Sequence, residues 1–329
     1  MTDGTAATGP ATGGSRLEHA PITFFATVMG LAGLTLALHA AETAYGLDPV
    51  ASRLARVATI AVFLAVTALY AAKIVLRTKA VVAEWNHPVR LAFFPTVSIS
   101  LLLLSITALD DWPGLARGLW LVGAVGQGVL TLAVISGWIG TRSFQHGHLN
   151  PAWFIPAVGN VIVPVAGVPL GYIELSWLFF SAGMLFWIVL LTLVFNRLVF
   201  HDPLPGRLQP TLVILIAPPA VAFVAWLRLN GGAVDATAHV LLSLAYVFAA
   251  IVAVQAPKLP SLPFALSFWA LSFPLAAITI ASFAYARVAA SAGHLWIGTG
   301  LLALLVAVIL GLVARTAVAI RRGEICRPE

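Results

Sequence analysis

Few side chains in this sequence could do chemistry where a ligand would meet them. The most polar side chain deep in the apolar segment 151–168 is Asn160, which lies between Pro156 and Pro164. Its amide could contact an ion, or it could hydrogen-bond a backbone carbonyl that a proline leaves without a partner. The same two alternatives apply to three hydroxyl groups of an earlier segment, those of Thr96, Ser98 and Ser100.

Reactive groups are absent where catalysis or cation transport would need them. The odd-numbered apolar segments carry no Asp, Glu, Lys or Arg near the middle, so proton-coupled transport and cation conduction lose support. Acids, bases, nucleophiles and metal ligands do not cluster on a shared face, and the single cysteine, Cys326, lies in the polar C-terminal tail. We therefore expect no enzyme activity, no cofactor and no metal.

The composition is that of a membrane protein. Hydrophobic residues make up 60% of the chain and charged residues only 9%, against about 25% charged residues in soluble domains. The apolar runs are continuous rather than alternating, which favours transmembrane helices over a β-barrel. The net charge of +6 comes from basic residues dispersed among short loops, so we expect a lipid bilayer as partner and no nucleic acid.

Ten apolar segments are long enough to cross a bilayer, since about 20 helical residues span its hydrocarbon core. The first is too long and too weakly flanked by basic residues to be a signal peptide. We expect an all-α integral membrane protein with a disordered cytoplasmic tail at 1–20, a channel domain at 21–320 and a second tail at 321–329. The predicted helices are 21–43, 53–76, 88–109, 115–140, 151–168, 172–200, 209–229, 236–255, 262–287 and 294–319.

The basic residues predict the orientation. An even number of helices places both termini on one side, and lysine and arginine concentrate on the cytoplasmic side of membrane proteins. Of the 18 basic residues, 13 fall on the side of the termini. Five fall on the other side, namely Arg53, Arg56, Arg117, Arg228 and Arg287. We therefore predict a bacterial inner membrane protein whose termini are both cytoplasmic.

Prolines divide the helices into two sets. The even-numbered segments have no interior proline, whereas Pro95, Pro156, Pro218 and Pro274 lie in odd-numbered segments, at spacings of 61, 62 and 56 residues. These spacings predict a repeat of five helical hairpins, with Gly30 as the flexible point of the first. A proline kink frees a carbonyl that lipid cannot satisfy, so the pattern favours five bent helices inside five straight ones, around a central pore.

Five motifs occur in order along the chain. They are NHPVRLAFF at 86–94, PAWFIPAVGN at 151–160, FHDPLP at 200–205, PTLVILIAPPAV at 210–221 and FWALSFPL at 268–275. On these motifs the sequence resembles the tellurite-resistance/dicarboxylate transporter family, which includes the plant slow-type anion channels.

The resemblance implies a homotrimer in which each protomer has five hairpins in quasi-fivefold arrangement around its own pore. It also implies that Phe273 plugs this pore, whereas the residues alone favour a phenylalanine that packs against a neighbour. The first helix departs from the family pattern, because Phe25 is followed by Ala26 where a glycine is expected. The candidates for lining the pore or bending its helices are Phe25, Gly30, Phe94, Pro95, Pro156, Asn160, Pro218 and Pro274.

Two residues are candidates for the cytoplasmic mouth of the pore. His87 and Arg90 lie at the cytoplasmic start of the segment 88–109. Arg90 could raise the local anion concentration there. Alternatively, both residues reflect topology or cap a neighbouring loop.

These observations favour a gated passive channel for small monovalent anions. The alternative is a secondary carrier for C4-dicarboxylates, sulfite or tellurite-type oxyanions. A dicarboxylate carrier should hold a fixed cation in its path to pair with the substrate, and the sequence places none in the middle of the membrane.

A reporter fused after Glu329 tests the orientation. Because basic residues predominate on the side of the termini, we expect activity from a reporter that works only in the cytoplasm. Activity from a reporter that works only in the periplasm would contradict the orientation and the even number of helices.

Overall fold

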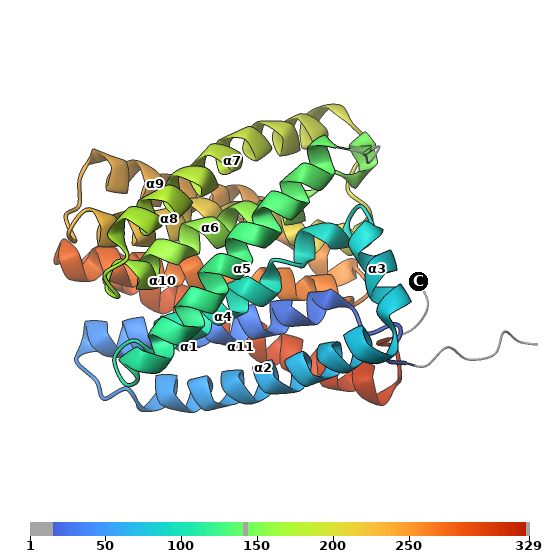
Figure 1. The fold of residues 1–329 in the computed structure, drawn as a ribbon. Helices are drawn as coiled ribbons and strands as arrows, with labels where there is room; N and C mark the ends of the chain where they lie inside the picture. Colours follow the sequence, from blue (N-terminus) through green and yellow to red (C-terminus); the bar gives the residue numbers. More distant parts are fainter. Residues whose placement is uncertain (1–15, 141–143, 327–329) are drawn as a thin grey trace, which may run out of the picture.

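The computed structural model describes residues 16–140 and 144–326 and shows an all-helical protein (Figure 1). Within these residues, nine helices are long and apolar enough to cross a membrane, and a tenth apolar helix, Pro151–Gly167, is shorter. The two ends of the described chain lie at the same end of the bundle (Figure 1). Most of the predicted N-terminal tail, the loop arginine Arg142 and the last three residues lie outside the described residues.

The odd-numbered segments share one construction, a short 3₁₀ segment followed by an α-helix. We refer to these five α-helices as the inner helices. The pairs are η1 (Ile22–Phe24) with α1 (Phe25–Tyr45), η2 (Arg90–Phe93) with α4 (Thr96–Ala108), η4 (Pro151–Trp153) with α6 (Phe154–Gly167), η5 (Gly206–Ile216) with α8 (Ala217–Leu229), and η7 (Leu266–Leu271) with α10 (Ser272–Val288).

The prolines lie at the junctions between these paired segments. Pro95 is the N-cap of α4, Pro218 is in the first turn of α8, and Pro156 and Pro274 are the third residues of α6 and α10. The first N–H groups of an α-helix have no partner within the helix, so a proline there removes no hydrogen bond. These four prolines therefore lie at the starts of α-helices. The kinks within helices that the sequence had suggested for them are not observed. Pro164 alone lies inside one of the described α-helices.

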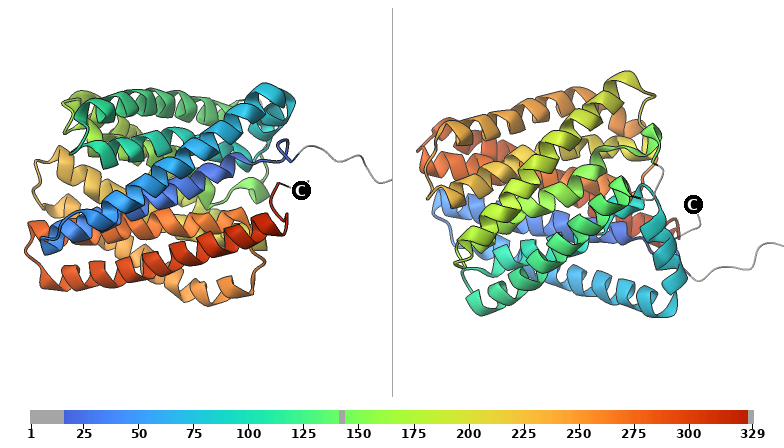
Figure 2. Two further views of the ribbon diagram at one scale, coloured as in Figure 1. Left: turned by 90° about the horizontal axis from the view of Figure 1, so that it is seen from below. Right: turned by 45° about the horizontal axis from the view of Figure 1, so that its top comes forward.

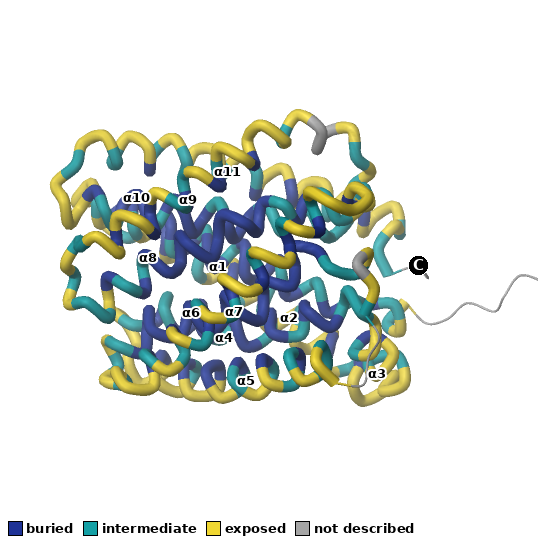
Figure 3. The backbone as a smooth tube through the Cα atoms, turned by 90° about the horizontal axis from the view of Figure 1, so that it is seen from above, coloured by how far each residue is buried: buried dark blue, intermediate teal, exposed yellow. Residues whose placement is uncertain are grey.

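The even-numbered segments are single long α-helices, which we call the outer helices. Between 17% and 33% of the residues in their apolar windows are buried, against 56–72% in the long inner spans, and all of α6 is buried. Figure 3 shows the buried backbone concentrated in the interior of the bundle. The outer helices are α2 (Val50–Leu76), α5 (Pro113–Ile139), α7 (Ile173–Phe200), α9 (Ala236–Gln255) and α11 (Ala292–Arg321).

Contacts between the inner helices form a closed cycle. Helix α1 packs against α4, α4 against α6, α6 against α8, α8 against α10, and α10 against α1. Each inner helix also packs against the outer helix that follows it in sequence. Figure 2 shows the N-terminal helices beside the C-terminal ones, where the contact between α1 and α10 closes the cycle.

The predicted ends of the ten segments agree with the structure to within four residues. One helix was missed: α3 (Thr78–Asn86) lies between α2 and η2, where the sequence was assigned to a loop. Its nine residues carry too few apolar positions to signal a membrane helix.

A buried ion pair fastens α3 to the start of the chain. Lys73 Nζ lies 2.7 Å from Glu84 Oε2 and donates a second hydrogen bond to the Ala20 carbonyl at 2.8 Å. Glu84 also accepts hydrogen bonds from the Ile22 backbone N–H at 2.7 Å and from the Tyr70 hydroxyl at 3.1 Å. The side chains of the pair are 2% and 1% exposed. Water therefore cannot solvate either charge, and each is stabilised by its partners within the protein.

Removing one partner of this pair should destabilise the protein strongly. Glu84→Ala leaves the Lys73 charge buried without a counter-charge, which costs about 3–5 kcal/mol. We expect a large fall in Tm in detergent. The double variant Lys73→Met, Glu84→Leu should recover much of this loss, and Glu324→Ala, which removes an exposed partner of Arg322, should change little. A Glu84→Ala protein as stable as the Glu324→Ala control would show that the cluster does not hold α3 in place.

Candidate functional site

A cavity of about 580 Å³ lies among the five inner helices, at the end of the bundle away from the termini. Its wall is apolar along most of its length. Polar and charged side chains line it mainly at the helix ends, where exposed residues show that it reaches the surface. Each inner helix contributes apolar side chains, among them Leu36, Leu103, Ile162, Val224 and Ile280.

A second cavity, of about 50 Å³, lies toward the end of the bundle that carries the termini. The same five inner helices line it, together with η1, η2, η5 and η7. Its lining residues include Met29, Ile99, Val158, Ile214 and Trp269. The two cavities therefore follow one another along the axis of the contact cycle.

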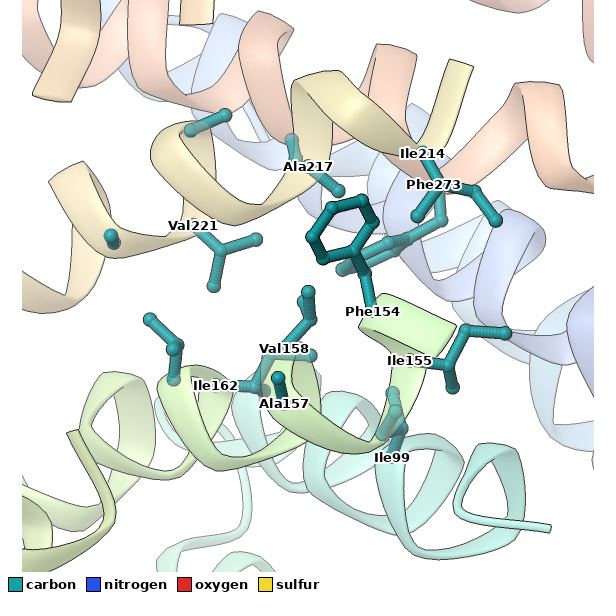
Figure 4. Packing of buried hydrophobic residues seen from close by; sticks show 14 of the residues in the cluster. Ile99, Phe154, Ile155, Ala157, Val158, Ile162, Ile214, Ala217, Val221 and Phe273 are labelled. Atoms are coloured by element: carbon teal, nitrogen blue, oxygen red, sulfur yellow. The ribbon is translucent and has the colours of Figure 1, made fainter. Parts of the chain in front are cut away.

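Phe273 is the one described residue that lines both cavities. It is the second residue of α10, immediately before Pro274, and is 8% exposed. Figure 4 shows its side chain among those of Phe154, Ile214 and Ala217, in the space between α6 and α8. The ring thus stands between the larger and the smaller cavity.

The prolines predicted to line the pore lie at the level of the smaller cavity, but most of them face away from it. Thr96, Ile155 and Ala217 line this cavity, whereas the adjacent Pro95, Pro156 and Pro218 do not. Successive helical residues point about 100° apart, so neighbours in sequence lie on different faces. Pro274 differs from the other three prolines, because it lines the smaller cavity together with Phe273.

The other aromatic and glycine candidates pack between helices. The Phe25 ring packs edge-on against Tyr70 of α2, with 6.1 Å between centroids, and Phe94 packs edge-on against Trp85 of α3 at 4.8 Å. Helix α1 is continuous through Gly30, and a Cβ at this position would collide with the Ser272 side chain. None of these three candidates lines either cavity.

Asn160 belongs to a buried polar network between α4, α5 and α6. Its Nδ2 donates to the Pro156 carbonyl at 2.7 Å and to Thr131 Oγ1 at 3.0 Å. Gln127 Nε2 donates to the same carbonyl at 2.9 Å, and the Ser98 hydroxyl donates to Gln127 Oε1 at 2.7 Å. In this structure the amide of Asn160 is thus engaged by a carbonyl at the start of a helix and does not face a cavity.

The central member of this network, Gln127, was not predicted from the sequence. Gln127 is completely buried, although it lies on an outer helix. A glutamine in the middle of an apolar, proline-free segment was the available signal, because an amide at membrane depth needs partners within the protein. The position of Gly159 supports its role, since a Cβ there would overlap the Gln127 side chain.

The hydroxyl groups of α4 are also used within the protein. Thr96 donates to the Phe93 carbonyl at 2.5 Å, and Ser100 donates to the Thr96 carbonyl at 2.7 Å. Ser98 additionally contacts the Pro95 carbonyl at 2.9 Å. These bonds satisfy carbonyls around the junction between η2 and α4, and Thr96 alone of the three lines a cavity.

His87 and Arg90 lie near the end of the bundle that carries the termini. The His87 Nδ1 accepts hydrogen bonds from the backbone N–H groups of Val89 and Arg90, at 3.2 and 3.3 Å. This geometry caps the start of η2. Neither residue lines the two cavities, so their role at a mouth of the pore stays a prediction.

The opposite mouth carries titratable and charged side chains, of which Arg228 and Arg287 entered the sequence analysis only in the prediction of topology. His39, Asp110, Arg228 and Arg287 line the larger cavity at its exposed end, and His39 Nε2 lies 3.5 Å from Asp110 Oδ2. The sequence places these residues at the ends of odd-numbered segments. A cavity inside a ring of helices must open at such ends, so their positions could have indicated the mouth.

A separate ion pair lies beside this mouth. Asp111 pairs with Arg56, which also donates to the Thr107 carbonyl at 2.7 Å, and with Arg53 at 3.7 Å. The hydrogen bond from Arg56 holds the pKa of Asp111 below its usual range. This carboxylate therefore stays ionised, and its negative charge is paired with the positive charges of Arg53 and Arg56.

The contact between α1 and α10 depends on a glycine. A Cβ at Gly33 would lie 2.7 Å from Ala276 Cβ and 3.5 Å from Phe273 Cδ2. Real Cβ atoms do not approach another carbon as closely as 2.7 Å, so a side chain here would push the two helices apart. Gly33 thereby lets α1 support the backbone that carries Phe273.

Comparisons with known proteins identify similar sequences. A family model described as voltage-dependent anion channel, SLAC1, matches residues 19–317. The chain is 29% identical over 268 residues to a tellurite resistance protein TehA homolog of Haemophilus influenzae, which covers 80% of this chain and 81% of that protein. It is 29% identical over 238 residues to the S-type anion channel SLAH3 of Arabidopsis thaliana, covering 71% of this chain and 37% of that protein.

An archaeal protein is similarly related. An uncharacterized transporter of Methanocaldococcus jannaschii is 28% identical over 223 residues, covering 61% of this chain and 64% of that protein. The matched region therefore spans less than two thirds of the archaeal and plant relatives.

Gly33→Ala tests the contact between α1 and α10. The added methyl group overpacks the interface, which costs about 1–3 kcal/mol, so we expect a clearly lower Tm in detergent. Gly311→Ala on α11 is the matched control, because nothing lies within 4 Å of its Cβ position. This control should leave Tm unchanged or raise it slightly, since alanine favours a helix. Equal effects of the two substitutions would show that close approach at Gly33 has no importance.

Proposed function

Because this chain belongs to the voltage-dependent anion channel family, SLAC1, we propose that it is a gated passive channel for small monovalent anions. Membership confirms the resemblance inferred from the five motifs. The protein is thus a multi-pass membrane protein of a family of anion channels and transporters. The proposal also assigns the conducting path and the gate within it.

The position of Phe273 supports the assignment of the gate. Two cavities lined by the same five helices meet at this ring. An aromatic ring at a narrow apolar point blocks ions by filling the space and by excluding water. Phe273 requires no charge to close such a path, and rotation or displacement of the ring would join the cavities.

The lining supports weakly hydrated monovalent anions as the substrate. The wall between the mouth and Phe273 is apolar, and its carboxylate, Asp110, lies at the exposed end. Ions must shed much of their hydration to pass an apolar wall, which disfavours strongly hydrated divalent ions. A dicarboxylate carrier would need cationic partners midway along the path, and the described lining has none there.

The proposal includes the arrangement implied by the family resemblance. Five hairpins stand in quasi-fivefold arrangement around the pore, three protomers assemble into a trimer, and both termini are cytoplasmic in a bacterial inner membrane. The closed cycle of inner helices supports the ring, and the common side of the two chain ends supports an even number of spans. The junction prolines set the level of the constriction in this ring.

Reversal potentials distinguish the channel from the carrier. Purified protein in planar bilayers is exposed to gradients of chloride, nitrate and malate. A channel gives currents that follow the Nernst potential of a permeant anion and do not depend on a proton gradient. Saturable exchange without such currents would establish the carrier in its place.

Phe273→Ala should raise the anion current. Removing the ring opens a gap between the two cavities, so current per assembled protein should rise by at least about tenfold if the ring is the main barrier, equivalent to about 1.4 kcal/mol in the barrier. Phe273→Leu should fall between alanine and the wild type, because leucine restores part of the apolar bulk. Current is measured after quantifying folded protein in the membrane.

Phe223→Ala serves as the matched control. Phe223 is completely buried on α8, packs against Tyr285 and lines neither cavity. Its truncation should lower the amount of folded protein, at a cost of about 3–5 kcal/mol, without raising current per protein. An unchanged or lowered current per protein in Phe273→Ala would remove the gate assignment.

A further inference from the structure

The mouth of the larger cavity carries two arginines at corresponding positions. Arg228 lies in the last turn of α8 and Arg287 in the last turn of α10, and these two helices pack against each other. Both side chains are exposed and both line the cavity. The guanidinium groups are near enough to repel each other electrostatically.

Neither arginine has a partner among the described residues. No hydrogen bond or ion pair joins Arg228 or Arg287 to residues 16–140 or 144–326. Two other arginines at this end of the bundle do have a partner, because Arg53 and Arg56 both pair with Asp111. The two unpaired guanidinium groups therefore keep their donors available to the aqueous mouth.

The charges around this mouth favour an anion. Asp110 also lines the cavity and attracts Arg228, and its Oδ2 lies 3.5 Å from His39 Nε2. Two guanidinium charges therefore line the mouth together with one carboxylate. An anion between the arginines would relieve their mutual repulsion and use their donors.

We propose that Arg228 and Arg287 form an anion-capture site at the mouth opposite the termini, selective for small oxyanions such as nitrate and monocarboxylates. The inference rests on the proposed channel function and deepens it. A guanidinium group presents its N–H donors in a planar fork that matches two oxygens of such an anion. Capture at the mouth raises the local anion concentration next to the apolar wall and so increases the rate of entry.

Conductance at low and high salt tests the capture. Planar bilayers carry the protein, with about 10 mM or about 1 M sodium nitrate on the side of the arginines, since the Debye length is about 30 Å in the first and about 3 Å in the second. We expect Arg228→Gln and Arg287→Gln each to lower nitrate conductance about two- to fivefold at the low concentration. Conductance at the high concentration should be nearly unchanged, and the double variant should lose more than either single variant.

Two further variants separate a built site from general charge. Arg117→Gln removes a positive charge at the same end of the bundle, on outer helix α5 and outside the cavity lining, and should leave conductance unchanged at both concentrations. The double substitution of Arg228 and Arg287 by lysine keeps the charge but loses the planar fork. It should keep chloride conductance and lower the preference for nitrate over chloride.

The results of these experiments distinguish failure of the capture site from failure of the channel function. An unchanged conductance at low salt in the double glutamine variant overturns the capture site, as does a lysine variant identical to the wild type in its preference for nitrate. If the wild type carries no anion current, the channel function fails, and the site is judged by binding alone. Nitrate at constant ionic strength should then raise Tm of the purified wild type but not of the double glutamine variant, and equal shifts would overturn the site.

Discussion

The bilayer demands that every backbone N–H and C=O find a partner inside the protein, and the rest of this structure depends on that demand. Each inner segment changes from a 3₁₀ segment to an α-helix within its span, and each change leaves carbonyls that lipid cannot satisfy. The interrupted segments therefore lie inside, and the uninterrupted helices surround them. Buried side chains complete the pairing: the Pro156 carbonyl accepts from both Gln127 and Asn160.

Helix type, segment ends and family were within reach of the sequence, because long apolar runs, prolines and motifs are local signals. Four prolines mark where inner α-helices start, and these starts lie at the level of the smaller cavity. They did not give the lining face, which depends on the rotation of each helix against its neighbours: Ile155 faces the cavity and Pro156 does not. Helix α3 escaped prediction because it is short and weakly apolar, and the Lys73–Glu84 pair escaped it because the partners of a buried charge are contacts in space.

Charge and cavity are distributed in a way that separates two tasks. Around the larger cavity, the described charged side chains lie at the exposed end, while the wall between them and Phe273 is apolar. Long-range attraction acts where ions are still hydrated, and the apolar wall acts where they must lose water. The proposed path therefore captures anions at the mouth before the apolar wall removes their water, and neither step requires a buried charge that would bind an ion too tightly to release it.

The contact cycle has one junction that differs from the others, because α1 and α10 come from opposite ends of the chain. Four of the five contacts join inner helices that follow one another, so they can form while the polypeptide is still being synthesised. The fifth, where Gly33 meets Ala276 beside Phe273, requires the last hairpin. The hairpin that carries Phe273, the proposed gate, is consequently the last to join the cycle. Until that hairpin is made, the inner helices can form only an open arc, and the contact between α1 and α10 then joins the first and the last inner helices of the chain.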